Sequence, residues 1–494
     1  MFKNFIIIIG LITLLPTVCF AGKVNVKRLH KANWIHFETK NFNVLTDAEE
    51  ERALELVREL EDFKYFLSTI LQYKQKPLSQ KVFVVAAKNP GTFKSTGIPG
   101  AYTGIFTKGY GDTIFVQCDG FRSSSKGKNN SGRTTVFHEL VHLFIHNSFS
   151  ESAIHPWYDE GMAEYFSTYM EKNGKAIIGD MGVHKNRFYS MLKTGEGFEK
   201  IDTEDLFKIT RADLNIFNTN RRHGEFLDKF YARALIVVHY MLADTNRTKQ
   251  LSQYIYSLNK GGSIDESFKH AFKMTFPELD REIFKYINGK DLNVQTFKIG
   301  KDGINFPVVK LKRQEITKRD ALGFLFINIA ILPEKFLDER SFDKLNSDVE
   351  KLYPGLINDI LRQQLAEKPE NILVLTRVAN IYKKMNKYSE AIDLYERALL
   401  LDDTDAFTLN NYAWLLVTMD ENELRNPARA IELAKKAVAI ERSPDRLDTL
   451  AEAYYVNGTF QMAIKTINEA IAIGTGDNRY LKKQRRKYKK DVKN

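Results

Sequence analysis

Cysteine is scarce in this chain, which has only Cys19 and Cys118 among its 494 residues. Because Cys19 lies in an N-terminal segment that we expect to be removed, the mature chain would keep one thiol and could form no internal disulfide. Beyond that segment, no apolar run approaches the ~20 residues needed to cross a bilayer. These absences exclude a disulfide-stapled scaffold and a protein with several membrane spans.

The first residues, MFKNFIIIIGLITLLPTVCFAGK, are typical of a secretory signal peptide. Lys3 supplies the positive charge, residues 5–15 form the apolar stretch, and Cys19-Phe20-Ala21 places small residues before a cleavage site. A retained membrane anchor fits less well, because the apolar run is short and Pro16 interrupts it. We therefore expect residues 1–21 to be cleaved and the protein to be periplasmic or secreted by a bacterium.

The length predicts two or three domains, because single cores stop growing beyond about 250–300 residues. The net charge is +11, and much of it lies in the last fifteen residues, where eight basic residues accompany one acid, Asp491. We interpret residues 481–494 as a basic tail at the solvated end of a terminal helix, and leave contact with an anionic surface open. We expect no nucleic-acid partner and no transmembrane span.

The first part of the chain shows strand patterns followed by helix patterns. The stretch 34–45 alternates as strands do, residues 48–71 have the 3.6-residue spacing of a helix, and residues 81–87 form a β-branched strand pattern. Two further strands near Ala101 and Thr113 precede a Gly/Ser-rich stretch at 119–135, and helix patterns run from 206 to 287. We predict an α+β domain over 30–290 and a junction over 291–318.

The C-terminal third contains a repeated helix-pair pattern within residues 319–480. Small residues recur in three columns, each with three members: Ala379, Ala413 and Ala451; Ala391, Ala430 and Ala463; Ala398, Ala437 and Ala470. These columns resemble tetratricopeptide repeats, in which small side chains let paired helices pack closely. The resemblance implies an all-α solenoid with a groove for a protein partner.

One motif carries metal chemistry: His138-Glu139-Leu140-Val141-His142. On a helix, positions i and i+4 lie nearly above one another, so His138 and His142 can both face one ion. Zinc accepts such imidazole nitrogens and needs at least one more protein ligand in a catalytic site. Glu139 lies beside the first histidine, where a general base for a metal-activated water is found in such motifs. We predict one catalytic Zn²⁺.

The third ligand is expected from PWYDEGMAEYFSTY, where helical phasing puts Glu160 and Glu164 on one face. We assign Glu160 as the ligand and Glu164 as the support of a ligand histidine. We interpret His146 and His155 as ordinary histidines, and Asp159 as facing another side of its helix. The metzincin class is excluded, because it would need Gly at position 145 and His at 148, where the chain has Ile145 and Ser148.

HELVH with Glu160 inside W-Y-D-E-G-M-A-E-Y resembles the gluzincin metallopeptidases, and most closely the bacterial peptidase MA-like proteins. The resemblance covers about residues 34–290 and implies a zincin-like fold, with His138, His142 and Glu160 as ligands and Glu139 as the base. Tyr231 is our candidate oxyanion donor, with the following alternatives: Arg233, His223 and His239. The aminopeptidase GxMEN-type stretch is absent, and PGAYTGIF stands in its place.

An edge strand through this stretch could hold an extended peptide by strand addition. The expected substrate-binding residues are Ala101, Tyr102, Thr103 and Gly104. Taken together, the motifs predict an exported zinc peptidase with a peptide or protein substrate, whose repeats recruit that substrate or a partner. Two alternatives stay open: a non-catalytic interaction scaffold that acts through the repeats, and a zinc hydrolase of a non-peptide amide.

Overall fold

The computed structural model describes most of the chain after the expected signal peptide. The described residues are 23–71, 81–100, 102, 104–107, 112–118, 131–148, 154–183, 201–209, 213–214, 221–289, 292, 294–332, 336–473 and 479–491. The predicted signal peptide and Ala101, Thr103 and residues 119–130 of the Gly/Ser-rich stretch lie outside them. Within this part of the chain, no helix combines the length and apolarity of a membrane span.

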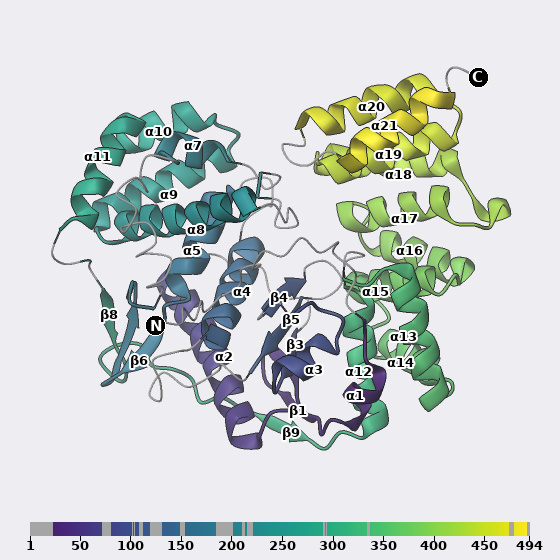
Figure 1. Ribbon diagram of the computed structural model, residues 1–494, viewed down its shortest axis with the longest axis horizontal. Coiled ribbons are helices and arrows are strands. Elements are labelled where there is room, and N and C mark those ends of the chain that lie inside the picture. Colours follow the sequence, from purple (N-terminus) through teal and green to yellow (C-terminus); the bar gives the residue numbers. More distant parts are fainter. Residues whose placement is uncertain are drawn as a thin grey trace, which may run out of the picture.

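A six-stranded mixed sheet forms the base of the N-terminal part (Figure 1). Its strand order is β4-β5-β3-β2-β1-β9, and the parallel pairs are β2 with β3 and β3 with β5. The strands are β1 (Ile35–Glu38), β2 (Phe42–Thr46), β3 (Val82–Ala87), β4 (Gly104–Thr107), β5 (Thr113–Gln117) and β9 (Lys312–Gln314). The stretch 34–45, predicted as one strand, forms the two antiparallel strands β1 and β2. The strands expected near residues 81–87, 101 and 113 correspond to β3, β4 and β5.

Two helices pack on one face of this sheet: α2 (Glu50–Leu71) and α4 (Ser131–Ser148). α2 buries one apolar stripe with helical spacing, as the sequence predicts: Ala53, Leu56, Val57, Leu60, Phe63, Phe66 and Leu67. Phe63 stacks on Phe137 of α4 with ring centroids 4.1 Å apart. This core fixes α4, which carries the HELVH motif, against the sheet.

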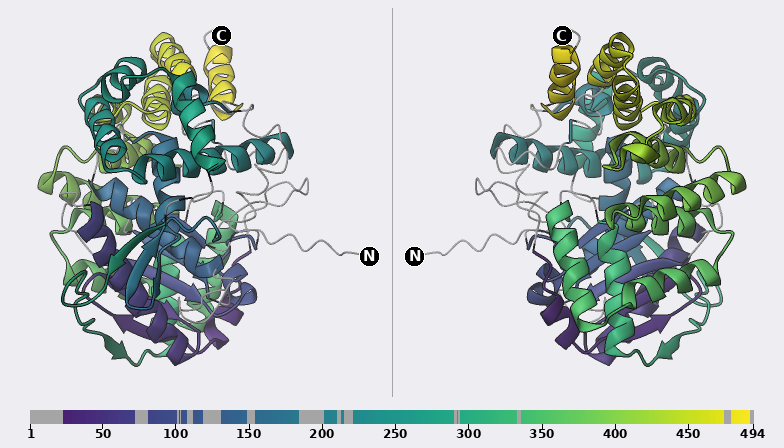
Figure 2. Two further views of the ribbon diagram at one scale, coloured as in Figure 1. Left: turned by 90° about the vertical axis from the view of Figure 1, so that its left-hand side faces the viewer. Right: turned by 90° about the vertical axis from the view of Figure 1, so that its right-hand side faces the viewer.

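The other face of the sheet is covered mainly by the part of the chain after residue 317, seen in front of the strands in the right-hand view of Figure 2. Strand residues Leu45, Val85 and Phe115 share one buried cluster with α12 (Lys318–Ala330) and with the repeat helices. α12 is apolar on all sides, as expected for a helix enclosed between two layers. The sheet and the repeat region therefore share a hydrophobic core.

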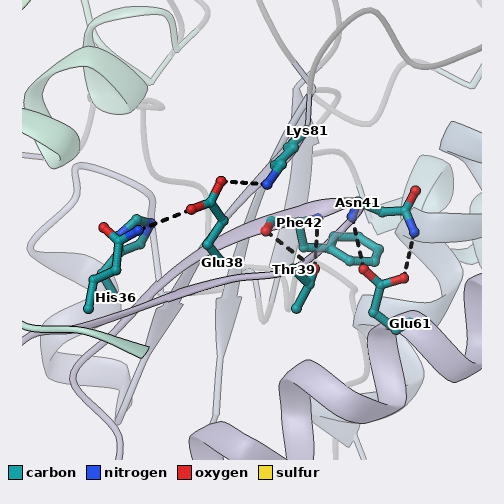
Figure 3. A network of polar contacts seen from close by, with 8 residues as sticks. His36, Glu38, Thr39, Asn41, Phe42, Glu61 and Lys81 are labelled. Carbon is teal, nitrogen blue, oxygen red and sulfur yellow. Dashed lines mark hydrogen bonds and ion pairs between the residues drawn. The ribbon is translucent and has the colours of Figure 1, made fainter. Parts of the chain in front are cut away.

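The hairpin between β1 and β2 is fixed by polar contacts at its turn (Figure 3). The Thr39 amide donates to the Phe42 carbonyl over 2.9 Å, and the Asn41 amide donates to Glu61 of α2 over 2.9 Å. Lys81 forms an ion pair with Glu38 at the start of the neighbouring strand. These contacts set the register of the hairpin against α2 and β3.

A helical layer follows the HELVH helix in the chain: α5 (Pro156–Phe166), α7 (Thr203–Lys208), α8 (Arg221–Leu242), α9 (Thr245–Asn259), α10 (Ile264–Phe272) and α11 (Phe276–Ile287). Two short helices complete the N-terminal part: α1 (Val26–Lys31) and α3 (Pro90–Lys94). A second sheet of three antiparallel strands consists of β6 (Met170–Lys172), β7 (Lys175–Ile178) and β8 (Gln295–Lys298). The segment 291–318, expected as a junction, contributes β8 to this sheet and β9 to the larger one.

The described residues of the repeat region form helices joined by short turns, and the three columns of small residues lie on three successive helix pairs. After α13 (Glu339–Leu352) and α14 (Leu356–Glu367) come three pairs: α15 (Ile372–Lys384) with α16 (Tyr388–Leu401), α17 (Ala406–Thr418) with α18 (Pro427–Ile440), and α19 (Pro444–Val456) with α20 (Phe460–Ile473). All nine alanines of the three small-residue columns have 0% exposure. The extra residues of the second unit form a 3₁₀ turn, η2 (Asn422–Leu424), before α18.

The basic C-terminal segment forms helix α21 (Arg479–Asp491), which packs on α20 and closes the array. Tyr488 is fully buried and donates to Glu452 of α19 over 2.9 Å, and Lys487 forms an ion pair with the same carboxylate. Asp448, one turn before Glu452, is also buried, and its Oδ1 accepts no hydrogen bond from the described residues. The interface between α19 and α21 therefore holds a buried carboxyl that Tyr480 contacts by a hydrogen bond, while its Oδ1 is left without one.

Burial and the neighbouring Glu452 raise the pKa of Asp448 to about 7. Since this folded-state pKa lies above the unfolded value of about 3.9, the native state keeps a proton that the unfolded state loses between these two pH values. Stability therefore falls as the pH rises from about 4 to about 7, and the loss is complete above 7. At pH 8 we expect Asp448→Asn to raise the free energy of unfolding by up to about 4 kcal/mol, and therefore to raise Tm. At pH 4 we expect Tm to change little. Thermal unfolding at both pH values, with Glu452→Gln as a destabilised control, checks this; a lower Tm for Asp448→Asn at pH 8 contradicts it.

Candidate metal centre

The HELVH helix is held in place at its beginning and along its buried side. Arg133, in its first turn, forms an ion pair with Glu59 of α2 and donates to the Tyr169 carbonyl before β6. Its guanidinium lies 4.3 Å above the Phe137 ring. His138 and His142, four residues apart, lie on one side of this fixed helix, as the spacing predicts.

α5 brings the second half of the centre. It begins with Pro156 at its first position, and nearly all its side chains are buried, Glu160 being the one that keeps intermediate exposure. A Cβ at Gly161 would lie 2.6 Å from the Ala234 carbonyl oxygen and 2.6 Å from Val238 Cγ2, both in α8. Glycine at this position therefore allows α8 to lie directly against α5, and this close packing fixes α5 beside α4.

Three side-chain atoms from these helices converge. His138 Nε2 and His142 Nε2 are 3.0 Å apart, and Glu160 Oε2 lies 3.3 Å from the first and 3.4 Å from the second. The three atoms thus form a nearly equilateral triangle of one oxygen and two nitrogens. Among the described residues, this is the one group of three or more His, Cys, Asp or Glu side chains that could hold a metal ion.

The triangle fits zinc. Ligand atoms bound at about 2.0–2.1 Å in a tetrahedron are separated by about 3.3 Å, close to the three distances here. Glu160 Oε2 is buried and accepts no hydrogen bond of good geometry from the described residues, although it faces two imidazoles. Burying a carboxylate oxygen in this way costs free energy that a bound cation would offset. Two imidazoles and one carboxylate are also a donor set that suits zinc.

Two further carboxylates support the histidines. Asp159 is 1% exposed, and its Oδ1 lies 2.8 Å from His142 Nδ1. Glu164 Oε1 lies 3.7 Å from His138 Nδ1, beyond hydrogen-bond distance but close enough for electrostatic attraction. Each carboxylate thus faces the ring nitrogen that points away from the triangle, and so orients the ring and favours one tautomer.

The sequence predicts that Asp159 faces another side of its helix from Glu160 and gives it no role, so the contact with His142 is new information from the structure. Asp159 and Glu160 point to different sides of α5, yet α4 crosses close enough for both to contact His142. Helical phasing alone does not give the position of a neighbouring helix. A signal for this residue was nonetheless present, since a carboxylate next to a ligand is well placed to bind the far nitrogen of a ligand histidine.

The charges of this cluster shift its pKa values in opposite directions. Burial lowers the pKa of His142, but the carboxylates of Asp159 and Glu160 outweigh it and raise the pKa well above the usual value. Burial raises the pKa of Glu160, yet the positive His142 and His138 lower it further, so the net shift is downward. For Glu139, burial dominates and raises the pKa of the carboxyl. The ligand carboxylate is therefore kept ionised, whereas Glu139 is made more basic.

The candidate oxyanion donors Tyr231, Arg233 and His239 all belong to α8. Tyr231 lies on α8, half-buried, with its ring edge-on to Phe230 at 5.6 Å. Arg233 is buried in an ion pair with Asp280, and both ring nitrogens of His239 have partners in Tyr286 and Gly179. Arg233 and His239 are thus engaged elsewhere, and Tyr231 as oxyanion donor stays a prediction.

The other candidate histidines are only partly described. His155 is the residue that precedes α5. The side chains of His146 and His223 lie outside the described residues. Of the predicted substrate-binding residues, Tyr102 and Gly104 are described, and Gly104 begins β4, the edge strand next to β5.

Comparisons with known proteins concern the repeat region. The tetratricopeptide repeat family matches residues 372–405, which coincide with α15, α16 and the turn after them. This segment is a tetratricopeptide repeat. Among solved structures, the chain is similar to a thermophilic TPR protein from Thermus thermophilus, with 16% identity over 35% of this chain and 91% of that one. The TM-score is 0.25, too low to define a shared fold. Comparison with curated proteins gives no match.

Proposed function

We propose that this protein is an exported, zinc-dependent peptidase of the gluzincin type, with a zincin-like N-terminal domain and repeats that recruit its substrate or a partner. One observation carries the proposal: the ligand triangle of His138, His142 and Glu160, with sides of 3.0, 3.3 and 3.4 Å. A structural site would not need a carboxylate next to its first ligand, and Glu139 occupies that position.

In this proposal His138, His142 and Glu160 hold the ion, and Asp159 and Glu164 orient the two imidazoles. Zinc bound there would polarise the scissile carbonyl and make a water molecule acidic enough to attack near neutral pH. Glu139 would accept a proton from the attacking water and pass it to the leaving amine. Its raised pKa favours this role, because a general base works best when its pKa lies near the working pH.

The edge strand β4 is the proposed place for an extended peptide. In the described residues β4 pairs with β5 on one side, and α4 packs against both strands. A Cβ at Gly104 would lie 2.6 Å from Thr135 Cγ2 in the first turn of α4, so β4 runs close to the HELVH helix. A peptide added to the outer edge of β4 would gain main-chain hydrogen bonds beside the centre.

The metal content of the purified mature chain, residues 22–494, tests the proposal. We expect about one zinc per chain in the parent and a large loss in Glu160→Gln, which keeps the side-chain size but removes the anionic ligand. Glu164→Gln serves as the matched control, because it changes a carboxylate on the same helix that supports a ligand without binding the ion. We expect it to lower zinc affinity by about 10–100-fold and to leave the site fillable in excess zinc.

The possible results separate the alternatives. A parent chain without stoichiometric zinc, even after reloading, would overturn the peptidase proposal. It would favour an interaction scaffold, which the tetratricopeptide repeat at residues 372–405 supports. Zinc retained in Glu160→Gln would assign the third ligand to another residue. Zinc bound without hydrolysis of a peptide library would favour a zinc hydrolase of a non-peptide amide.

A further inference from the structure

The edge strand β4 contacts both halves of the molecule. Alternate side chains of a strand point to opposite faces of the sheet. On one face, Gly104 lies against α4, and Phe106 packs on the core around α2 and α4. On the other face, Ile105 belongs to the buried cluster that β5 shares with α12 and the repeats. The position of β4 is therefore set from the metal side and from the repeat side together.

Tyr102, two residues before β4, contacts the connection between α12 and α13. The Tyr102 ring packs edge-on against Phe336, with centroids 5.4 Å apart, and the Tyr102 carbonyl accepts from Gln117 Nε2 over 2.7 Å. Phe336 is 5% exposed and lies in the connection between α12 and α13. A side chain from the C-terminal half thus supports the start of the edge strand.

α12 is in turn fixed to the sheet and to the first repeat. Thr113, which pairs with Thr107 of β4, donates to Asn328 of α12 over 3.1 Å. At the other contact, Lys384 of α15 donates to the carbonyls of Ala330 and Leu332 over 2.8 and 3.3 Å. A cation at a helix C-terminus is favourable, because it interacts with unsatisfied carbonyls there. Described contacts therefore link the matched repeat to α12, α12 to β5, and β5 to β4.

We propose that the first tetratricopeptide repeat positions the substrate-binding edge strand through α12 and Phe336, and so controls how tightly the peptidase binds its substrate. This inference rests on the proposed function. Strand addition needs the amides and carbonyls of β4 held in place to pair with the peptide, so a strand that is less well fixed would bind the substrate less tightly. Phe336 and Asn328 act as positioning residues, because they reach the substrate only through β4.

The test compares four full-length mature chains: the parent, Phe336→Ala, Phe336→Leu and Leu447→Ala. The last is the matched control, since Leu447 is buried in the third repeat, away from the sheet. Fluorescein-labelled casein is the probe for kcat and KM, and hydrogen exchange reports on residues 104–107. Zinc content is measured in all four chains.

We expect Phe336→Ala to keep the zinc content and the kcat of the parent. KM should rise about tenfold, which in free energy corresponds to roughly one net hydrogen bond. Hydrogen exchange of the β4 amides should become faster. Phe336→Leu should recover most of the loss, and Leu447→Ala should leave both KM and β4 exchange at parent values. If Phe336→Ala unfolds, Asn328→Ala replaces it, because it removes a hydrogen bond without removing a packed ring.

Unchanged KM and unchanged β4 exchange in the Phe336 variant would overturn the inference while the peptidase proposal stands. A parent chain that binds no zinc and hydrolyses no casein overturns the proposed function instead. In that case the exchange measurement still decides whether the repeat region positions β4.

Discussion

Glu139→Gln is expected to lower kcat by at least about 10³-fold while the zinc content stays at that of the parent. Glutamine has nearly the same size as glutamate, but it cannot accept the proton of the attacking water. Glu139 lies next to His138 in the chain but is not part of the ligand triangle, so its replacement leaves the three ligand atoms in place. Steady-state hydrolysis of casein, together with zinc analysis of the same samples, measures both quantities.

Glu139→Asp is the matched control for this variant. It keeps a carboxylate and shortens the side chain by one methylene, so we expect a smaller loss of kcat and no loss of zinc. A Glu139→Gln chain that retains more than about a tenth of the parent kcat would show that another group acts as the base, because general-base catalysis typically contributes 10²–10⁴-fold.

The sequence carried enough information to predict the parts of the centre that follow from local periodicity. The four-residue spacing of His138 and His142 is a property of any α-helix, and the phasing of Glu160 follows from Pro156 starting α5. The alanine columns of the repeats were equally predictable, because only small side chains fit where two helices approach closely. In each case, the periodicity of a single helix was sufficient to predict which side chains share a face.

Features that depend on contacts between distant segments could not be predicted in this way. The contact of Asp159 with His142 depends on how α5 crosses α4, and Gly161 permits that arrangement by its contact with α8. β9 joins the sheet beside β1 although nearly three hundred residues separate them in the chain. α12 is buried between the repeats and the sheet, and nothing within its own sequence identifies the sheet as a partner.

A chain that ends at residue 317 is expected not to fold. This truncation removes α12 and all the repeats, although α1 and α3 remain in the same cluster. It removes the partners of the following large apolar side chains of the six-stranded sheet: Leu45, Val85, Ile105 and Phe115. Each large apolar side chain contributes about 1.5–3 kcal/mol on burial, so the loss is on the order of 10 kcal/mol, comparable with the total stability of a typical domain.

The matched control for this truncation ends at residue 441, after α18. It removes α19, α20 and α21 but keeps α12 and the first repeat on the sheet. We expect this shorter array to unfold cooperatively and to retain zinc, whereas the chain ending at residue 317 should be insoluble or lack a cooperative transition. Expression in soluble form, near-ultraviolet circular dichroism and thermal unfolding distinguish the two outcomes.

The point substitution Leu325→Ala examines the same interface without removing any helix. Leu325 is fully buried in the cluster that α12 shares with the sheet, so truncating it should cost about 2–5 kcal/mol. Because α4 packs on the opposite face of that sheet, we expect the metal centre and the repeats to lose structure in one transition. Two separate transitions, with zinc released only in the second, would instead show that the N-terminal part is stable without the repeats.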